Sequence, residues 1–270
     1  MARRILWSAL SLALALTLPL SAQIDLDEEN DILAILPLDE LLDNYYQAMG
    51  GEKAWLETNS LKMTGVMRMG PGMDAPFTAY SLRPDKRRLE FTFQGLTGVQ
   101  AINGNEAWTL MPFMGQTTPQ PMPEEMATQM RELLDIEGPL IDFVAKGHTL
   151  EYLGIGQAQG IDAYKIKVLL ESGSVHTYYL DGEDFVPFLL ESTRTDDGVV
   201  VESETLLKDY ELVEGLLLPH TIEIRAKGQP GGQVVKIEEV EVDLELADVQ
   251  FEMPTIGTQD GSQDAAEETE

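Results

Sequence analysis

The sequence predicts a mainly β protein, in which a few helices cover the concave face of a strongly curved antiparallel sheet of about 11 strands. Three observations predict this fold class. From Leu61 onward the apolar pattern shortens towards a period of two, and turn residues interrupt it at short intervals. The connections are too short to contain crossover helices, so neighbouring strands must be antiparallel. A sheet this wide needs closure or a cover, which the helices supply.

Residues 1–22 have the pattern of a secretory signal peptide. Arg3 and Arg4 precede an apolar run, 5–20, and the small residues Ser21 and Ala22 follow it. The run is shorter than the ~20 residues that a membrane-spanning helix needs. We therefore expect cleavage after Ala22 and an exported, soluble protein, with an uncleaved anchor as the alternative.

Helical spacing follows an acidic leader, 23–37. Apolar residues recur every three or four positions over 38–49, and Gly50 and Gly51 stop the pattern. A short second helix is expected around residues 53–56. The segment 121–134 has the same spacing, with Met122, Met126 and Met130 after an N-terminal turn of Pro123, Glu124 and Glu125. Gly138 and Pro139 predict a further short helix that ends at Val144.

Strands fill most of the remaining chain. Leu89, Phe91 and Phe93 alternate with polar residues, so one face of that strand is apolar. After residue 144 the pattern predicts strands over 148–156, 161–170, 174–181, 186–194, 199–210, 216–226 and 233–246. The sequence thus predicts one domain over 38–257, followed by an acidic disordered tail over 258–270.

Composition excludes several classes of function. The chain has 47 acidic and 18 basic residues, a formal charge of -29, which argues against nucleic acids and anionic lipid headgroups as partners. It has no cysteine, so disulfides, thiolate metal sites and a lipidated N-terminal cysteine are excluded. His148, His176 and His220 lie in no catalytic pattern, and an enzymatic role rests only on His220 and dispersed carboxylates. We expect no enzyme, no catalytic residue, no metal and no cofactor.

Methionine is concentrated in one half of the chain, where it indicates a lining for varied apolar ligands. The alternative is an irregular core filled by adaptable side chains. The loop 111–115 favours a binding surface, because its large apolar groups follow no strand pattern. The predicted residues of the cavity or its lid are Met63, Met67, Met69, Phe77, Phe91, Phe93, Trp108, Met111, Phe113, Met114, Met122, Met126 and Met130.

Several segments together resemble the outer membrane lipoprotein-sorting-like family, relatives of the periplasmic lipoprotein carrier LolA and the receptor LolB. The resemblance spans roughly 38–254 and is carried by 45–51 (YYQAMGG), 103–108 (NGNEAW) with Pro112 and Phe113, 138–140 (GPL) with 146–147 (KG), 178–181 (YYLD), and 209–210 (DY) with Gly215 and 218–220 (LPH).

This resemblance implies a LolA-like half-barrel of about eleven strands, with helices as a lid over an apolar concavity that receives acyl chains. LolA latches its lid with an arginine, and the sequence does not single out Arg68, Arg83, Arg87, Arg88 or Arg131 for that role. LolB is lipid-anchored, whereas this chain has no cysteine to carry a lipid.

Two hypotheses follow. The first is a periplasmic, monomeric, non-enzymatic carrier or binding protein for lipid or lipoprotein acyl chains, which exchanges them with donor and acceptor proteins of the inner or outer membrane. The helix that carries Met122, Met126 and Met130 is its predicted mobile lid. The second hypothesis is an envelope protein-protein interaction module with a packed core and no ligand.

Overall fold

The computed structural model describes residues 33–70, 72–196 and 198–255 of the chain. The predicted signal peptide, the first part of the acidic leader and the acidic tail lie outside these residues. Within the described ranges, none of the helices has the length and apolar character needed to cross a membrane. The fold is mainly β, as predicted, and is built on one large antiparallel sheet.

Helices are few and short in the described part of the chain. The α-helices are α1 (Leu38–Ala48), α2 (Glu52–Glu57) and α3 (Glu124–Arg131), and the 3-10 helices are η1 (Pro112–Met114) and η2 (Asp248–Gln250). All three α-helices begin within three residues of the start of a predicted helix, and acidic residues in the first turn of each favour helix initiation.

The sheet contains thirteen strands. The sequence predicted about 11 strands, and the two-residue strand β6 was not among them. They are β1 (Ser60–Arg68), β2 (Asp74–Leu82), β3 (Lys86–Phe93), β4 (Leu96–Asn103), β5 (Glu106–Leu110), β6 (Gln120–Pro121), β7 (Thr149–Ala158), β8 (Ile161–Leu169), β9 (Val175–Asp181), β10 (Pro187–Asp196), β11 (Val199–Val213), β12 (Leu216–Ala226) and β13 (Gln233–Val242).

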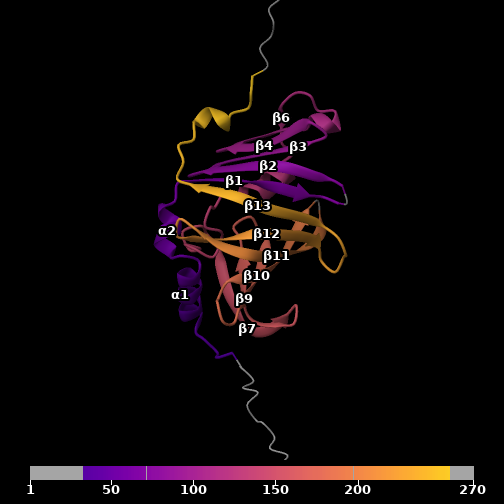
Figure 1. The fold of residues 1–270 in the computed structure, drawn as a ribbon. Coiled ribbons are helices and arrows are strands. Elements are labelled where there is room, and N and C mark those ends of the chain that lie inside the picture. Colours follow the sequence, from indigo (N-terminus) through magenta and orange to yellow (C-terminus); the bar gives the residue numbers. More distant parts are fainter. Residues whose placement is uncertain (1–32, 71, 197, 256–270) are drawn as a thin grey trace, which may run out of the picture. The chain divides into compact units, whose positions relative to one another are not determined.

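The first and last strands of the chain, β1 and β13, are neighbours in the middle of the sheet. The strand order is β6-β5-β4-β3-β2-β1-β13-β12-β11-β10-β9-β8-β7, so β13 pairs with β1 (Figure 1). The first six strands build outward to one edge, and the last seven return from the opposite edge. The segment 122–148, which we call the crossover, joins the two edges and contains α3 near its start. It must therefore pass across one face of the sheet.

All three α-helices cover the same face. Leu61, Ser81, Arg87 and Ile102 lie directly opposite one another in β1 to β4, so they share one face, which we call the inner face. Leu61 packs in the cluster that contains α1 and α2, and Ile102 packs under α3. The inner face is therefore the core side of the sheet.

Helix α1 is fixed by its apolar stripe and by close contact at its end. Leu41, Leu42 and Tyr45 are buried against the inner face of the last strands. Gly50 follows the helix with φ +100°, and a Cβ at this position would lie 1.9 Å from the carbonyl oxygen of Gly215. Only glycine fits here, since it combines a positive φ with backbone contact. The predicted helix stop is confirmed, and the structure adds its steric reason.

One local prediction was wrong. The segment 138–144 forms turns and no helix. Gly138 and Asp142 have φ values of +73° and +50°, and such left-handed residues interrupt the repeating hydrogen bonds of a helix. Isolated turn bonds replace them, such as the bond from the Gly147 amide to the Val144 carbonyl oxygen at 3.1 Å.

Candidate functional site

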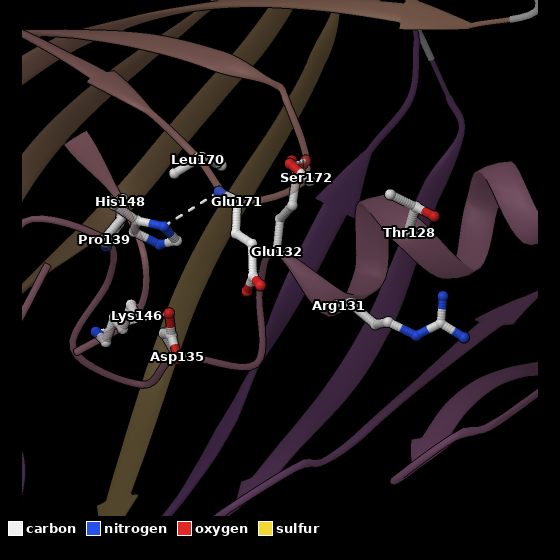
Figure 2. Close-up of a pocket in the computed structure, with 10 residues that line it drawn as sticks. All are labelled: Thr128, Arg131, Glu132, Asp135, Pro139, Lys146, His148, Leu170, Glu171 and Ser172. Atoms are coloured by element: carbon white, nitrogen blue, oxygen red, sulfur yellow. Dashed lines mark hydrogen bonds and ion pairs between the residues drawn. The ribbon is translucent and has the colours of Figure 1, made fainter. Parts of the chain in front are cut away.

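A cleft lies between the crossover and the turns that join β8 to β9 and β10 to β11. Two adjoining pockets, of about 420 and 480 Å³, form it and share Thr128, Glu132 and Ser172. Figure 2 shows how residues of α3, of the later crossover and of the β8–β9 turn converge on the first pocket. This pocket is lined by Thr128, Arg131, Glu132, Asp135, Pro139, Lys146, His148, Leu170, Glu171 and Ser172.

Glu132 fastens the end of α3 to the β8–β9 turn. Its carboxylate accepts hydrogen bonds from the hydroxyls of Ser172 and Ser174, both at 2.6 Å. The Nε2 atom of His176 lies 4.0 Å from the other carboxylate oxygen. Burial lowers the pKa of His176, and the nearby Glu132 carboxylate opposes that shift only in part. The imidazole is therefore neutral near pH 7, and Glu132 is held mainly by the two serines.

Arg83 fastens the crossover to the end of α2. Its Nε donates to the carbonyl oxygen of Thr58 at 2.7 Å, and Nη2 donates to that of Trp55 at 3.0 Å. The same guanidinium forms an ion pair with Glu137, whose side chain is only 2% exposed. Lys146 completes the group, because its Nζ lies 2.7 Å from the second carboxylate oxygen of Glu137.

The protonation of Glu137 follows from these contacts. Burial by itself raises the pKa of this carboxyl group, but hydrogen bonds from Arg83 and Lys146 outweigh it and hold the pKa below its ordinary value. Glu137 is therefore ionised near neutral pH, with both carboxylate oxygens paired to cations. A third polar contact ties the crossover to the sheet, since Arg87 of β3 donates to the carbonyl oxygen of Leu133 at 3.1 Å.

The remaining groups of the cleft give no catalytic arrangement. His148 accepts a hydrogen bond at its Nδ1 from the amide of Glu171 at 3.3 Å, and burial lowers the pKa of this imidazole. Across the described ranges, no group of three or more His, Asp or Glu side chains could hold a metal ion. The charged side chains of the cleft mainly hold the crossover in place. The polar contacts of the cleft are therefore structural contacts that fasten the crossover.

Some of the predicted lining residues form one cluster on the inner face. Met67, Phe77, Phe91 and Met111 are buried together. Phe113 packs against this cluster, with its ring centroid 5.5 Å from that of Phe91 and 6.2 Å from that of Phe93. Met63 is partly buried and joins this cluster to the one beneath α1.

The predicted lid helix is shorter than expected, because α3 begins at Glu124 and Met122 precedes it. Met122 and Met130 are buried against Ile102 of β4, together with Ala127. Met126 is 39% exposed, and its sulfur lies 3.3 Å from the amide nitrogen of Gln100. Helix α3 therefore packs on the inner face and leaves part of its apolar surface open.

Three predicted lining residues lie elsewhere. Trp108 faces the outer side of the sheet, because the adjacent Ala107 faces α3 and successive strand residues alternate. Its indole donates to the carbonyl oxygen of Phe251 at 2.9 Å, and the C-terminal segment covers it. Met69 and Met114 are exposed at 41% and 77%, so neither lies in the buried cluster.

The middle of the inner face keeps an incompletely covered apolar surface. Its side chains belong to central strands and are only partly buried, although each faces the same side as the buried clusters. All of its members except Leu207 pack against the buried cluster beneath α1 or against the cluster that contains Met67. Its members are Met63, Leu89, Leu190, Leu207, Ile222, Val235 and Val240.

The fastening residues were not predicted from the sequence. Arg83 and Glu137 are 54 residues apart, and Glu132 is 40 residues from Ser172. No local spacing relates them, so periodicity could not find them. Arg83 was among the five arginines that the family resemblance left open, and it is the one that contacts both α2 and the buried Glu137.

An open antiparallel sheet whose edges are joined by a helix-bearing crossover over its inner face defines a LolA-like fold, and solved structures confirm it. A DUF1329 family protein from Desulfovibrio piger matches with a TM-score of 0.55 and 15% identity, over 80% of this chain and 97% of that one. A domain from Vibrio parahaemolyticus, described as an outer membrane lipoprotein-sorting protein domain, matches with a TM-score of 0.53 and 14% identity, over 79% and 96%.

A LolA superfamily protein from Nitrosomonas europaea matches with a TM-score of 0.53 and 11% identity, over 80% of this chain and 98% of that one. No family model matches the sequence, and no curated protein matches it. At these identities the likeness shows the fold, and the function must be argued from the site.

Proposed function

We propose that the protein is an exported, non-enzymatic carrier or binding protein that holds lipid or lipoprotein acyl chains against the inner face of its sheet. The observation that carries this proposal is the row of partly buried apolar side chains on the central strands, next to a crossover that combines buried apolar residues such as Leu140 and Ile141 with polar fastenings. The fold supports it, since a structure described as a lipoprotein-sorting domain shares this architecture.

Burial would supply the affinity. Each methylene group removed from water is worth ~0.8 kcal/mol, so one long acyl chain needs no charged clamp. The crossover would act as the lid, with Arg83 and Glu137 as its latch and Glu132 with Ser172 as a second fastening. Polar fastenings suit a lid, because water can replace each bond when the lid opens.

The predicted signal peptide supports a periplasmic location for this activity. The high negative charge supports a soluble monomer, since like-charged copies repel one another. Donor and acceptor proteins of the inner or outer membrane would load and unload the chain.

A covalent lock on the lid tests the proposal. The protein has no native cysteine, so the double variant Glu132→Cys/Ser172→Cys can be linked by a disulfide or a short bismaleimide without side reactions. We expect the unlocked protein to take up a fluorescent fatty acid, the linked protein to lose uptake, and reduction of the disulfide to restore it. Each single variant is the control. A native protein that neither yields lipid on extraction nor takes up the fatty acid rejects the proposal.

One observation favours the interaction module instead. Met67, Phe77, Phe91 and Met111 already fill their part of the inner face with their own side chains. The substitution Ile222→Trp separates the two functions, because Ile222 belongs to the partly buried row. Overpacking a filled core costs ~1–3 kcal/mol, whereas a vacant surface accepts the ring and loses fatty acid binding.

A further inference from the structure

An apolar groove runs between α1 and the later part of the crossover, away from the cleft. It has a volume of about 520 Å³ and is lined by Leu38, Asp39, Leu42, Asp43, Tyr46 and Phe143. We call it the α1 groove. Leu42 forms part of its buried floor, and Phe143 is partly exposed on the opposite wall. The two walls are joined by a hydrogen bond from the Tyr46 hydroxyl to the Leu140 carbonyl oxygen at 3.0 Å.

The rim of the α1 groove is acidic. Asp39 and Asp43 line it directly. Burial, together with the negative charges of Glu52, Asp43 and Asp142, raises the pKa of Tyr46 to about 12, which places these carboxylates near the phenol. The groove thus combines an apolar floor with negative charge on both walls, from α1 and from the crossover.

These carboxylates have no partners among the described residues. Asp39, Asp43, Glu52 and Asp142 form no hydrogen bond or ion pair through their side chains there. The contrast is with the sheet, where cross-strand pairs such as Lys208–Glu223, at 2.7 Å, neutralise surface acids. The nearest basic groups in sequence are engaged, since Lys53 pairs with Glu57 at 3.5 Å and Lys146 pairs with Glu137.

We propose that the α1 groove docks a segment of a partner protein in which apolar side chains are flanked by lysine or arginine. The floor would bury the apolar side chains, and the unpaired rim carboxylates would attract the flanking cations. This chemistry selects a basic amphipathic segment over an acidic or a purely apolar one, because desolvating unpaired carboxylates without a counter-charge is unfavourable. Such a partner contacts Phe143, and therefore the crossover as well as α1. The inference stands whether or not the inner face binds acyl chains.

A cysteine-protection experiment tests this surface in the full chain. Val144 is 73% exposed beside Phe143, and Val199 is 63% exposed at the start of β11. In the cysteine-free protein, Val144→Cys and Val199→Cys each introduce one thiol with similar access to a maleimide. The probe is a synthetic helical peptide with leucines at i, i+3, i+4 and i+7 and lysines along both sides of that face. A peptide with glutamate in place of lysine is its control.

We expect the lysine peptide to slow labelling of the Val144→Cys variant and to leave the Val199→Cys variant unchanged. Adding Asp39→Asn and Asp43→Asn should raise the Kd of the lysine peptide about tenfold, since each exposed ion pair contributes modestly to affinity. The pair Asp162→Asn and Glu183→Gln, in exposed positions elsewhere, controls for the loss of two charges. An equal effect of the two double variants, or equal protection of both thiols, would show that attraction to the net charge alone explains binding.

The other occupants give distinct results. Slow labelling of the Val144→Cys variant without peptide, relieved by dilution, would show that a second copy of the chain covers the α1 groove. Slow labelling that dilution does not change would show that another segment of the same chain covers it. Either result overturns the proposal, as does labelling that the lysine peptide leaves unchanged at saturating concentration.

Discussion

The guanidinium of Arg83 and the carboxylate of Glu137 form an ion pair that joins the β2–β3 turn to the crossover across 54 residues of sequence. Through the same side chain, Arg83 also donates to the carbonyl oxygen of Trp55 at the end of α2. One residue therefore connects a sheet turn, a covering helix and the segment that joins the two sheet edges. We therefore expect this ion pair to contribute to the stability of the fold.

Replacing Glu137 by glutamine should lower the free energy of unfolding by about 2–4 kcal/mol, because Arg83 and Lys146 would lose their shared counter-charge at a site that is 2% exposed. Urea unfolding followed by tryptophan fluorescence measures this change. Glu183→Gln, at an exposed turn, is the matched control and should change stability by less than about 0.5 kcal/mol. Equal effects of the two variants would contradict a structural role for the ion pair.

Replacing Gly50 by alanine should destabilise the protein by about 3 kcal/mol or more. The new Cβ would lie 1.9 Å from the Gly215 carbonyl oxygen, so the backbone must move, and φ is +100°. Gly51→Ala is an unusually close control, because Gly51 has φ +102° but open space around it. It should show only the conformational cost, about 1 kcal/mol. Thermal unfolding of both variants separates the cost of the steric contact with Gly215 from the cost of the positive φ. Similar melting temperatures of the two variants would contradict a steric contact at position 50.

Stability should fall as the pH drops below about 6.5, since burial lowers the pKa of His176 in the folded state. Between the folded and unfolded pKa values the unfolded chain binds the extra proton, so stability rises with pH through this window and is level above it. Urea unfolding at a series of pH values measures the slope. His176→Gln should flatten it. An unchanged slope in this variant would assign the pH dependence to other groups, such as His148, whose pKa burial also lowers.

Removing the hydroxyls of Ser172 and Ser174 together should loosen the crossover where Glu132 joins it to the β8–β9 turn. The carboxylate of Glu132 would lose both 2.6 Å hydrogen bonds, at an expected cost of about 1–3 kcal/mol. Under the proposed function, the Ser172→Ala/Ser174→Ala variant should exchange a fluorescent fatty acid faster than the native protein. Ser192→Ala, on the neighbouring β10, is a control of the same chemistry. Faster exchange in the control alone would argue against a lid at this position.

The fold class and the presence of most elements could be predicted from local pattern, although bounds such as those of α3, β11 and β13 differ by three or four residues. Residues 38–49 carry their helical stripe in consecutive turns, and Leu89, Phe91 and Phe93 alternate within one strand, so both signals are short-range. The mistaken helix over 138–144 shows the limit of such signals. Whether Asp142 adopts φ +50° depends on what the crossover must contact, which the segment itself does not record.

For the candidate site, too, one part could be predicted from the sequence and another part could not. Composition and spacing predicted apolar residues that line a cavity or its lid, and in the structure Met67, Phe77, Phe91 and Met111 lie together in one buried cluster. The same reasoning included Trp108, because a large apolar side chain on a strand gives no local sign of which side faces the core when both sides are covered.

The sequence by itself thus determined that this is an acidic, cysteine-free chain with a wide antiparallel sheet, a few covering helices and the pattern of a signal peptide. Periodicity and composition are local properties, and they can be recognised from the sequence alone. Only the tertiary structure decided where the crossover is fastened, which face Trp108 takes, and that the unpaired carboxylates of α1 border an apolar groove. Each of these depends on contacts between residues that are distant along the chain, and no local pattern encodes the partner of a long-range contact.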